Sequence, residues 1–191
     1  MSAEELERLR MARLYQVRTT IKDLVLSNAF DFFWTITFAD HRDDDALCFK
    51  RLNNFLDAHR RRFGTFGYIF IPERHKTGEI HFHGVSMGYM GEMVDSGHKD
   101  RTGSSIFNVP GWKYGFSTAT KIRSRDRASS YITKYITKDL MNSPVGFGKK
   151  KYWRSRGLEM PVVTYSASDL ADGSLVYENA LCKVYSNRPR L

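Results

Sequence analysis

The sequence predicts an α+β fold, and two kinds of pattern predict it. Three segments, residues 3–27, 49–63 and 124–140, repeat apolar residues at helical spacing. Several aromatic and β-branched runs are typical of strands, and two of them flank a short turn, which predicts an antiparallel hairpin. With 191 residues, 41% of them hydrophobic, the chain is long enough to bury a core as a single domain.

The first half of the chain should alternate helix and strand. The helix over residues 3–27 presents one apolar stripe at spacings of three and four, made of Leu14, Val17, Ile21 and Leu24. The run 32–38 is aromatic and β-branched, which indicates a buried central strand. A polar stretch then leads into the second helix, which should end at Gly64 and whose apolar residues are Phe49, Leu52, Phe55, Leu56 and Phe63.

A hairpin is expected next. Residues 67–73 and 79–86 flank the turn sequence Lys76-Thr77-Gly78, so they should pair as antiparallel strands. Residues 87–112 are polar and rich in Gly and Ser, which predicts a long loop. Strand character returns over residues 112–122.

The second hairpin strand contains His81-Phe82-His83. Side chains at i and i+2 share one face of a strand, so the two imidazoles should lie side by side while Phe82 points to the other face. Such a pair can hold a divalent metal ion, although an isolated His-x-His is more often just two exposed histidines. A carboxylate would complete the site, and Mg²⁺ or Mn²⁺ suits that ligand set. We favour Glu73, across the hairpin, with Glu79 as the alternative.

The segment from Ser124 to Leu140 contains a doubled Tyr-Ile-Thr-Lys repeat. On a helix, Tyr131, Lys134, Tyr135 and Lys138 fall within one stripe of about 100°, apart from the apolar residues that face a sheet. A phenol is a weak nucleophile near neutral pH unless cations or a metal stabilise the phenolate, and lysines also hold phosphate oxygens. The stripe is therefore a candidate catalytic group, against the simpler interpretation of boundary tyrosines and solvated lysines.

The positive charge is concentrated in one segment. Between Lys121 and Arg156 stand eleven Lys and Arg and only two Asp, which accounts for the entire net charge of +9. Concentrated positive charge indicates a polyanion partner, most simply nucleic acid, although a basic surface can also serve solubility alone. The predicted DNA-binding residues are Lys121, Arg123, Arg125, Arg127, Lys149, Lys150, Lys151, Arg154 and Arg156.

Other features limit the compartment. No apolar run is long enough to span a membrane, and the N-terminus lacks the apolar region of a signal peptide, so no membrane partner is expected. The two cysteines, Cys48 and Cys182, form no metal-binding pair, and such sparse use indicates a reducing compartment.

Three motifs, in this order, resemble the HUH endonucleases, which initiate rolling-circle replication. They are the aromatic-threonine strand Phe33–Phe38, the His81-Phe82-His83 motif, and the tyrosine motif Tyr131–Lys138. The two tyrosines four residues apart are similar to those of initiators from single-stranded DNA phages and related plasmids. The likeness runs from about residue 20 to 160, so we expect an N-terminal helix at 3–27, a core at about 28–160 and a C-terminal extension at 161–191.

The resemblance implies a central antiparallel sheet flanked by helices, with the histidines on a central strand and the tyrosine helix beside it. It also implies metal-dependent nicking of single-stranded DNA at a replication origin through a 5′-phosphotyrosine bond. No Walker A motif is present, so a separate helicase and host replication proteins would be partners, in the cytoplasm of a prokaryotic host cell.

Two alternative functions stay open. Transposases and conjugative relaxases share the histidine and tyrosine motifs, but relaxases usually place the tyrosine near the N-terminus, and transposases more often carry one. The other alternative is a non-catalytic single-stranded nucleic-acid-binding module that uses basic and aromatic residues.

Overall fold

The computed structural model describes residues 2–75, 77–137, 151–162, 174–178 and 183–186. The chain divides into two compact units, Met1–Pro161 and Val162–Leu191. In the second unit, which nearly coincides with the expected extension at 161–191, strands β8 (Ser174–Glu178) and β9 (Lys183–Ser186) form an antiparallel pair. The aromatic-threonine, histidine and tyrosine motifs all belong to the first unit.

The first unit is built on a seven-stranded sheet in which every neighbouring pair is antiparallel. The strand order is β4-β5-β6-β1-β3-β2-β7. The predicted α+β class with an antiparallel sheet is confirmed. The strands are β1 (Phe32–Ile36), β2 (Gly67–Arg74), β3 (Ile80–Met87), β4 (Val94–Lys99), β5 (Ser105–Asn108), β6 (Ser117–Lys121) and β7 (Trp153–Arg154).

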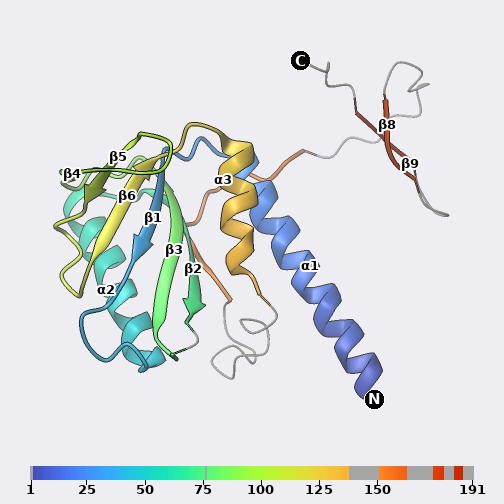
Figure 1. The fold of residues 1–191 in the computed structure, drawn as a ribbon, viewed down its shortest axis with the longest axis horizontal. Coiled ribbons are helices and arrows are strands. Elements are labelled where there is room, and N and C mark those ends of the chain that lie inside the picture. Colours follow the sequence, from blue (N-terminus) through green and yellow to red (C-terminus); the bar gives the residue numbers. More distant parts are fainter. Residues whose placement is uncertain (1, 76, 138–150, 163–173, 179–182, 187–191) are drawn as a thin grey trace. The chain divides into compact units, whose positions relative to one another are not determined.

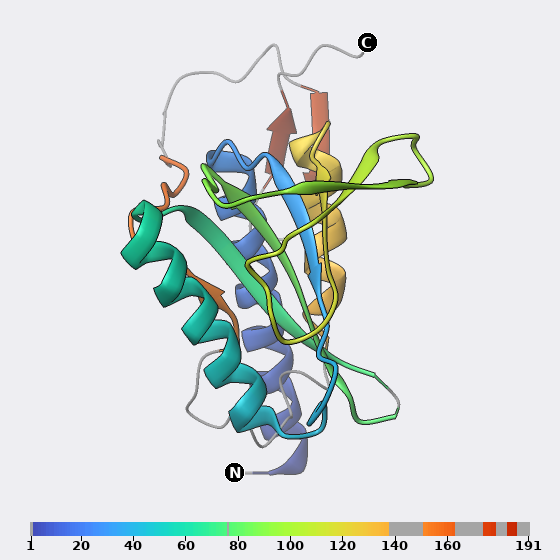
Figure 2. The same cartoon turned by 90° about the vertical axis from the view of Figure 1, so that its left-hand side faces the viewer.

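Helices lie on both faces of the sheet. The helix α2 (Asp45–Phe63) covers one face, while α1 (Ala3–Ser27) and α3 (Arg125–Ile132) lie together on the other (Figure 1). Turned by 90°, α2 lies in front of the sheet (Figure 2). The sequence sets the helix ends as predicted: the Ser2 hydroxyl accepts from the Glu5 amide, and α2 ends at Gly64, whose φ of +90° suits glycine.

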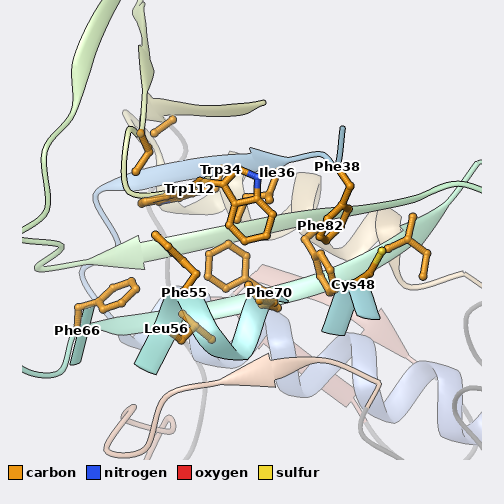
Figure 3. Packing of buried hydrophobic residues seen from close by; sticks show 14 residues of the cluster. Trp34, Ile36, Phe38, Cys48, Phe55, Leu56, Phe66, Phe70, Phe82 and Trp112 are labelled. Carbon is orange, nitrogen blue, oxygen red and sulfur yellow. The ribbon is translucent and has the colours of Figure 1, made fainter. Parts of the chain in front are cut away.

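The face under α2 carries an aromatic core. Trp34, Phe70 and Phe82 are fully buried there and pack against Leu52 and Phe55 of α2 (Figure 3). The buried indole of Trp34 donates a hydrogen bond of 2.7 Å to the Ser86 hydroxyl, so no polar atom of that ring is left unpaired. Cys48 is a buried free thiol in this core, whereas Cys182 lies outside the described residues.

The opposite face carries a second core, which joins the helices to the sheet. The stripe predicted for residues 3–27 is confirmed, since Leu14, Ile21 and Leu24 are buried against Ile69 and other residues of β2, β3 and α3. The buried Asn28 amide donates to the carbonyls of Leu24 and Glu159, and its oxygen accepts from the Glu159 amide. These bonds tie the end of α1 to the segment that follows β7.

Two predictions about secondary structure are wrong. The expected loop over residues 87–112 contains β4 and β5, whose polar residues lack the alternation by which strands are recognised. The helix expected to reach Leu140 ends at Ile132 and continues as one 3₁₀ turn, η1 (Thr133–Tyr135), after which Ile136 is non-helical. β-Branched residues, with their restricted χ1, surround this break and weaken the helix.

Smaller differences concern the faces and ends of elements. Phe63, expected on the apolar face of α2, is 43% exposed, and buried Cys48 and His59 belong to that face instead. The hairpin predicted at 67–73 and 79–86 is confirmed with shifts of one residue at its ends. None of the helices in the described part of the chain has the length and apolar character needed to cross a bilayer.

Candidate functional site

The histidine motif lies on the sheet face that carries α1 and α3. Val85 of β3 belongs to the core on that face, and Phe82 to the core under α2, so alternation puts His81 and His83 on the side of Val85. Gly84 follows for a steric reason: a Cβ there would overlap the Phe70 ring and the carbonyl oxygen of Ile69. The predicted shared face of the two imidazoles is therefore what the strand provides.

The carboxylate beside the histidines is Glu73. It is paired directly with His81 across the hairpin, and its Oε2 lies 2.8 Å from Nε2 of His83. Glu79, the alternative, forms an ion pair with Arg42 at 3.1 Å. The two acidic residues thus have different partners, and of the two only Glu73 forms a hydrogen bond to an imidazole of the motif.

His83 is held from both ring nitrogens. Its Nδ1 lies 3.2 Å from Oγ1 of Thr35, and its Nε2 faces Glu73. Burial lowers the pKa of His83 and outweighs the opposing effect of the Glu73 carboxylate, so the neutral ring is favoured. Because a carboxylate only accepts, the neutral ring donates from Nε2, and Nδ1 accepts from the Thr35 hydroxyl. A hydroxyl also accepts, so Thr35 suits the other tautomer as well.

His75 adds a third imidazole that the sequence patterns did not indicate. Its ring lies 4.1 Å from that of His81 between centroids, and its Nε2 lies 3.9 Å from Oε2 of Glu73. The pKa of His81 is lowered, mainly by burial and then by His75. Period-two alternation from Glu73 to His75 was the available signal for this residue.

The tyrosine motif reaches this cluster from the end of α3. The ring of Tyr135 stacks on the His83 imidazole, with centroids 3.6 Å apart and planes at 10°. Tyr131 contacts Tyr135 edge-on at 5.6 Å and Phe33 of β1 at 5.0 Å. The 3₁₀ turn after Ile132 brings these two phenols together, whereas the sequence predicted one continuous helical stripe.

The two phenols have different environments. Tyr131 is 47% exposed, and the ammonium group of Lys134 lies 5.3 Å from the centre of its ring. Burial, reinforced by a hydrogen bond with Tyr131, raises the pKa of Tyr135 well above the usual value for tyrosine. Tyr135 is consequently protonated near neutral pH. Lys138, the last predicted member of the motif, lies outside the described residues.

The predicted DNA-binding residues fall into two groups. Lys121 ends β6, and Arg123, Arg125 and Arg127 follow at the start of α3, where the Arg125 guanidinium donates to the Leu26 carbonyl at 3.4 Å. Near β7, a cavity of about 540 Å³ is lined by residues that include Lys151, Arg154 and Arg156. Lys151 is only 7% exposed, and burial lowers its pKa, so its ammonium group is not on the open surface. Lys149 and Lys150 lie outside the described residues.

The ligand set fits a divalent cation by its chemistry but is not arranged as a finished site. Over the described ranges, no three His, Cys, Asp or Glu side chains are grouped as metal ligands. Glu73 accepts from His83 directly, and the His81 ring lies against His75. Two neutral imidazoles and a carboxylate are nevertheless suitable ligands, and an ion would take the place of the hydrogen bond between Glu73 and His83.

Comparisons with known proteins identify the matching region. A family model that describes replication-associated proteins of the ORF2 type matches residues 31–140, which is more than half of the chain. This range starts before β1 and contains the β2–β3 hairpin, β6 and both tyrosines. No curated protein and no solved structure matches the chain.

Proposed function

Because the chain belongs to this family of ORF2-type replication-associated proteins, we propose that it is a metal-dependent enzyme that nicks and rejoins single-stranded DNA. It would act at a replication origin, as the HUH endonucleases do. One observation carries the proposal: Tyr135 stacks on His83, which is hydrogen-bonded to Glu73, and Tyr131 lies against Tyr135. Two candidate nucleophiles thus lie beside a group of metal-ligand type.

The reaction is a transesterification. The phenol oxygen of one tyrosine attacks the scissile phosphorus and forms a 5′-phosphotyrosine bond, while the bond from phosphorus to the 3′ oxygen breaks. The phenol loses its proton and the leaving 3′ oxygen gains one, so a free 3′-OH remains to prime synthesis. Reversal by a 3′-OH rejoins the strand without an external energy source.

The residues have separate roles in this proposal. His81, His83 and Glu73 would hold Mg²⁺ or Mn²⁺, and a bound ion would polarise the scissile phosphate and stabilise its developing charge. Thr35 orients the His83 ring through Nδ1. Lys134, beside the ring of Tyr131, supplies positive charge near the phenol and near a bound phosphate.

Two tyrosines permit a second round of transfer. While one phenol holds a 5′ end, the other can attack the newly made junction, which exchanges the bound end and lets a circle be closed. The distance of 5.6 Å between the two ring centroids supports alternation at one site. We further propose that unwinding comes from a separate helicase and host replication proteins in the cytoplasm of a prokaryotic cell.

The test is capture of the covalent product. A randomised pool of single-stranded DNA with a fluorescent 3′ label is incubated with the protein and Mn²⁺, then denatured in SDS. A 5′-phosphotyrosine linkage keeps the labelled 3′ fragment on the protein, and the released fragment has a 3′-OH that a DNA polymerase can extend. Sequencing of the captured DNA also gives the preferred site.

The matched control is the Tyr131→Phe, Tyr135→Phe double variant, which keeps both rings but has no phenol at either position. It should bind the DNA pool and form no adduct. If the wild-type protein also binds DNA and forms no adduct with either Mg²⁺ or Mn²⁺, the chain is a non-catalytic single-stranded DNA-binding module, and the proposed activity is wrong.

A further inference from the structure

The strongest unexplained surface feature in the described chain is the side chain of Phe116. It is 83% exposed, although burying a phenylalanine ring typically stabilises a protein by about 1.5–3 kcal/mol. Single exposed apolar residues are common, so exposure alone assigns no role. The position of this ring relative to the candidate catalytic cluster is what gives it one.

The backbone of Phe116 is firmly anchored while its ring is exposed. Its carbonyl accepts from the Thr37 amide at 2.8 Å, and its amide donates to the Thr37 hydroxyl at 3.2 Å. A Cβ on the preceding Gly115 would overlap the backbone of Thr37, Phe38 and Ala39, so glycine lets the two segments approach this closely. The ring is thus presented from a rigid support rather than from a free loop.

The sheet register puts Phe116 in line with the cluster. Ile36 pairs with Ser117 on one side and with Phe82 on the other, so the next position, Thr37, is flanked by Phe116 and His81. Ser117 is buried toward α2, and side chains alternate along a strand, so Phe116 points to the face of the histidines. Two strand spacings separate it from His81, which is about 10 Å.

The surface between them is polar and half-exposed. On β1 and β6, the side chains that alternate onto this face include Thr35, Thr37, Thr118 and Thr120, all of intermediate exposure. Hydroxyls of this kind hydrogen-bond to phosphate and sugar oxygens, while an exposed aromatic ring offers a stacking surface to an unpaired base. A polar floor with an exposed ring beside a nicking centre matches a single strand of DNA better than it matches an apolar protein partner.

We propose that Phe116 stacks on an unpaired base close to the scissile phosphate and so holds the DNA strand across β6 and β1. This inference rests on the proposed function, because it takes single-stranded DNA as the substrate. The ligand class is any nucleobase, since every base has a π-face, and the contact adds affinity and position rather than sequence preference.

The test separates stacking from charge. Binding of oligothymidylate is measured by fluorescence anisotropy in EDTA, which removes cleavage, over a series of salt concentrations. Phe116→Ala should bind roughly 5- to 150-fold more weakly at each concentration. The slope of log affinity against log salt should stay unchanged, because the number of neutralised phosphates is the same. Phe116→Trp should bind at least as tightly as wild type, and Phe116→Leu should be weakened like the alanine variant.

The matched control is Phe63→Ala, which removes another exposed ring in the last turn of α2, on the other face of the sheet. It should bind as wild type does, and circular dichroism should show that each variant is folded. Unchanged binding by Phe116→Ala, a flattened salt slope, or equal weakening by Phe63→Ala would each overturn the inference. A wild-type protein that binds and forms no covalent adduct would refute the proposed catalysis and leave the stacking result to stand separately.

Discussion

The ring of Tyr135 lies parallel to the imidazole of His83, with centroids 3.6 Å apart and planes inclined by 10°. The contact covers the histidine, which is only 7% exposed, and places a phenol next to a candidate metal ligand. Replacement by phenylalanine keeps this stacking and removes only the hydroxyl. Tyr→Phe variants therefore separate chemistry from packing.

Each tyrosine alone should support part of the reaction. We expect Tyr131→Phe and Tyr135→Phe each to retain some covalent adduct, and the double variant none. Tyr131 should be the stronger first nucleophile, because it is exposed and lies beside Lys134, while Tyr135 has a raised pKa. Peptide mapping of the adduct decides this. A DNA-linked peptide with only Tyr135 would reverse the assignment, and one with neither would refute the mechanism.

Glu73 and Glu79 should differ in metal binding. Glu73→Gln removes the carboxylate beside His83, so Mn²⁺ affinity should fall at least about tenfold. Glu79→Gln is the matched control, since Glu79 pairs with Arg42, and it should bind Mn²⁺ almost as wild type does. Electron paramagnetic resonance of free Mn²⁺ measures both. The opposite ranking would make Glu79 the ligand, and unaltered affinity in His81→Ala, His83→Ala would exclude the site.

Thr35 should act as a positioning residue for His83. Thr35→Val keeps the shape but loses the hydroxyl that faces Nδ1, so Mn²⁺ affinity should fall by about 10- to 100-fold. Thr35→Ser should restore most of it. Thr118→Val, at the position opposite Thr35 on β6, is the control for a lost hydroxyl on the same face. Equal Mn²⁺ affinity in Thr35→Val and wild type would contradict the role.

The basic residues that lead into α3 should contribute much of the salt-dependent affinity for DNA. Neutralising Lys121, Arg123 and Arg127 to Gln should weaken binding and flatten the salt slope by about 0.7 for each phosphate that is no longer neutralised. Arg125 is left intact because its bond to the Leu26 carbonyl also supports α1. Salt titration by anisotropy measures the slope. An unchanged slope would mean that DNA binds another face.

His59 should make stability depend on pH. Its Nδ1 faces the Gly64 carbonyl and its Nε2 accepts from the Met90 amide, so the folded ring is neutral, and burial lowers its pKa. Below about pH 6.5 the unfolded state takes up the proton first, so the free energy of unfolding should fall as pH decreases. The same decrease should be smaller in His59→Gln. Denaturation by urea between about pH 8 and 5 tests this, and equal pH slopes would contradict it.

Local patterns predicted the hairpin well because its two signals agree. Turn residues at Lys76-Thr77-Gly78 and alternation in both strands specify one register, and that register brings Glu73 opposite His81. The strand β4 carries no such signal, since its exposed polar sequence is held by pairing with β5 rather than by burial. Its existence depends on the neighbouring strand.

The candidate site was predictable in composition but not in arrangement. The residue types, from His81 to Tyr135, follow from motif spacing, yet the stacking of Tyr135 on His83 requires the helix to tighten after Ile132. A continuous helix satisfies the same apolar periodicity, so the sequence does not distinguish them. His75 was missed because its partner, His81, is close only after the hairpin closes.

The family match starts at residue 31, yet α1 supports the tyrosine segment. Arg18 donates to the Ile136 carbonyl at 2.9 Å, directly after the 3₁₀ turn, and Leu14, Ile21 and Leu24 cover Ile69, Ile71 and Val85 of the sheet. A fragment trimmed to residues 31–140 would leave that apolar face in water. Expression fragments and fusion tags should therefore respect residues 2–28 as an integral buttress, although they carry none of the reacting groups.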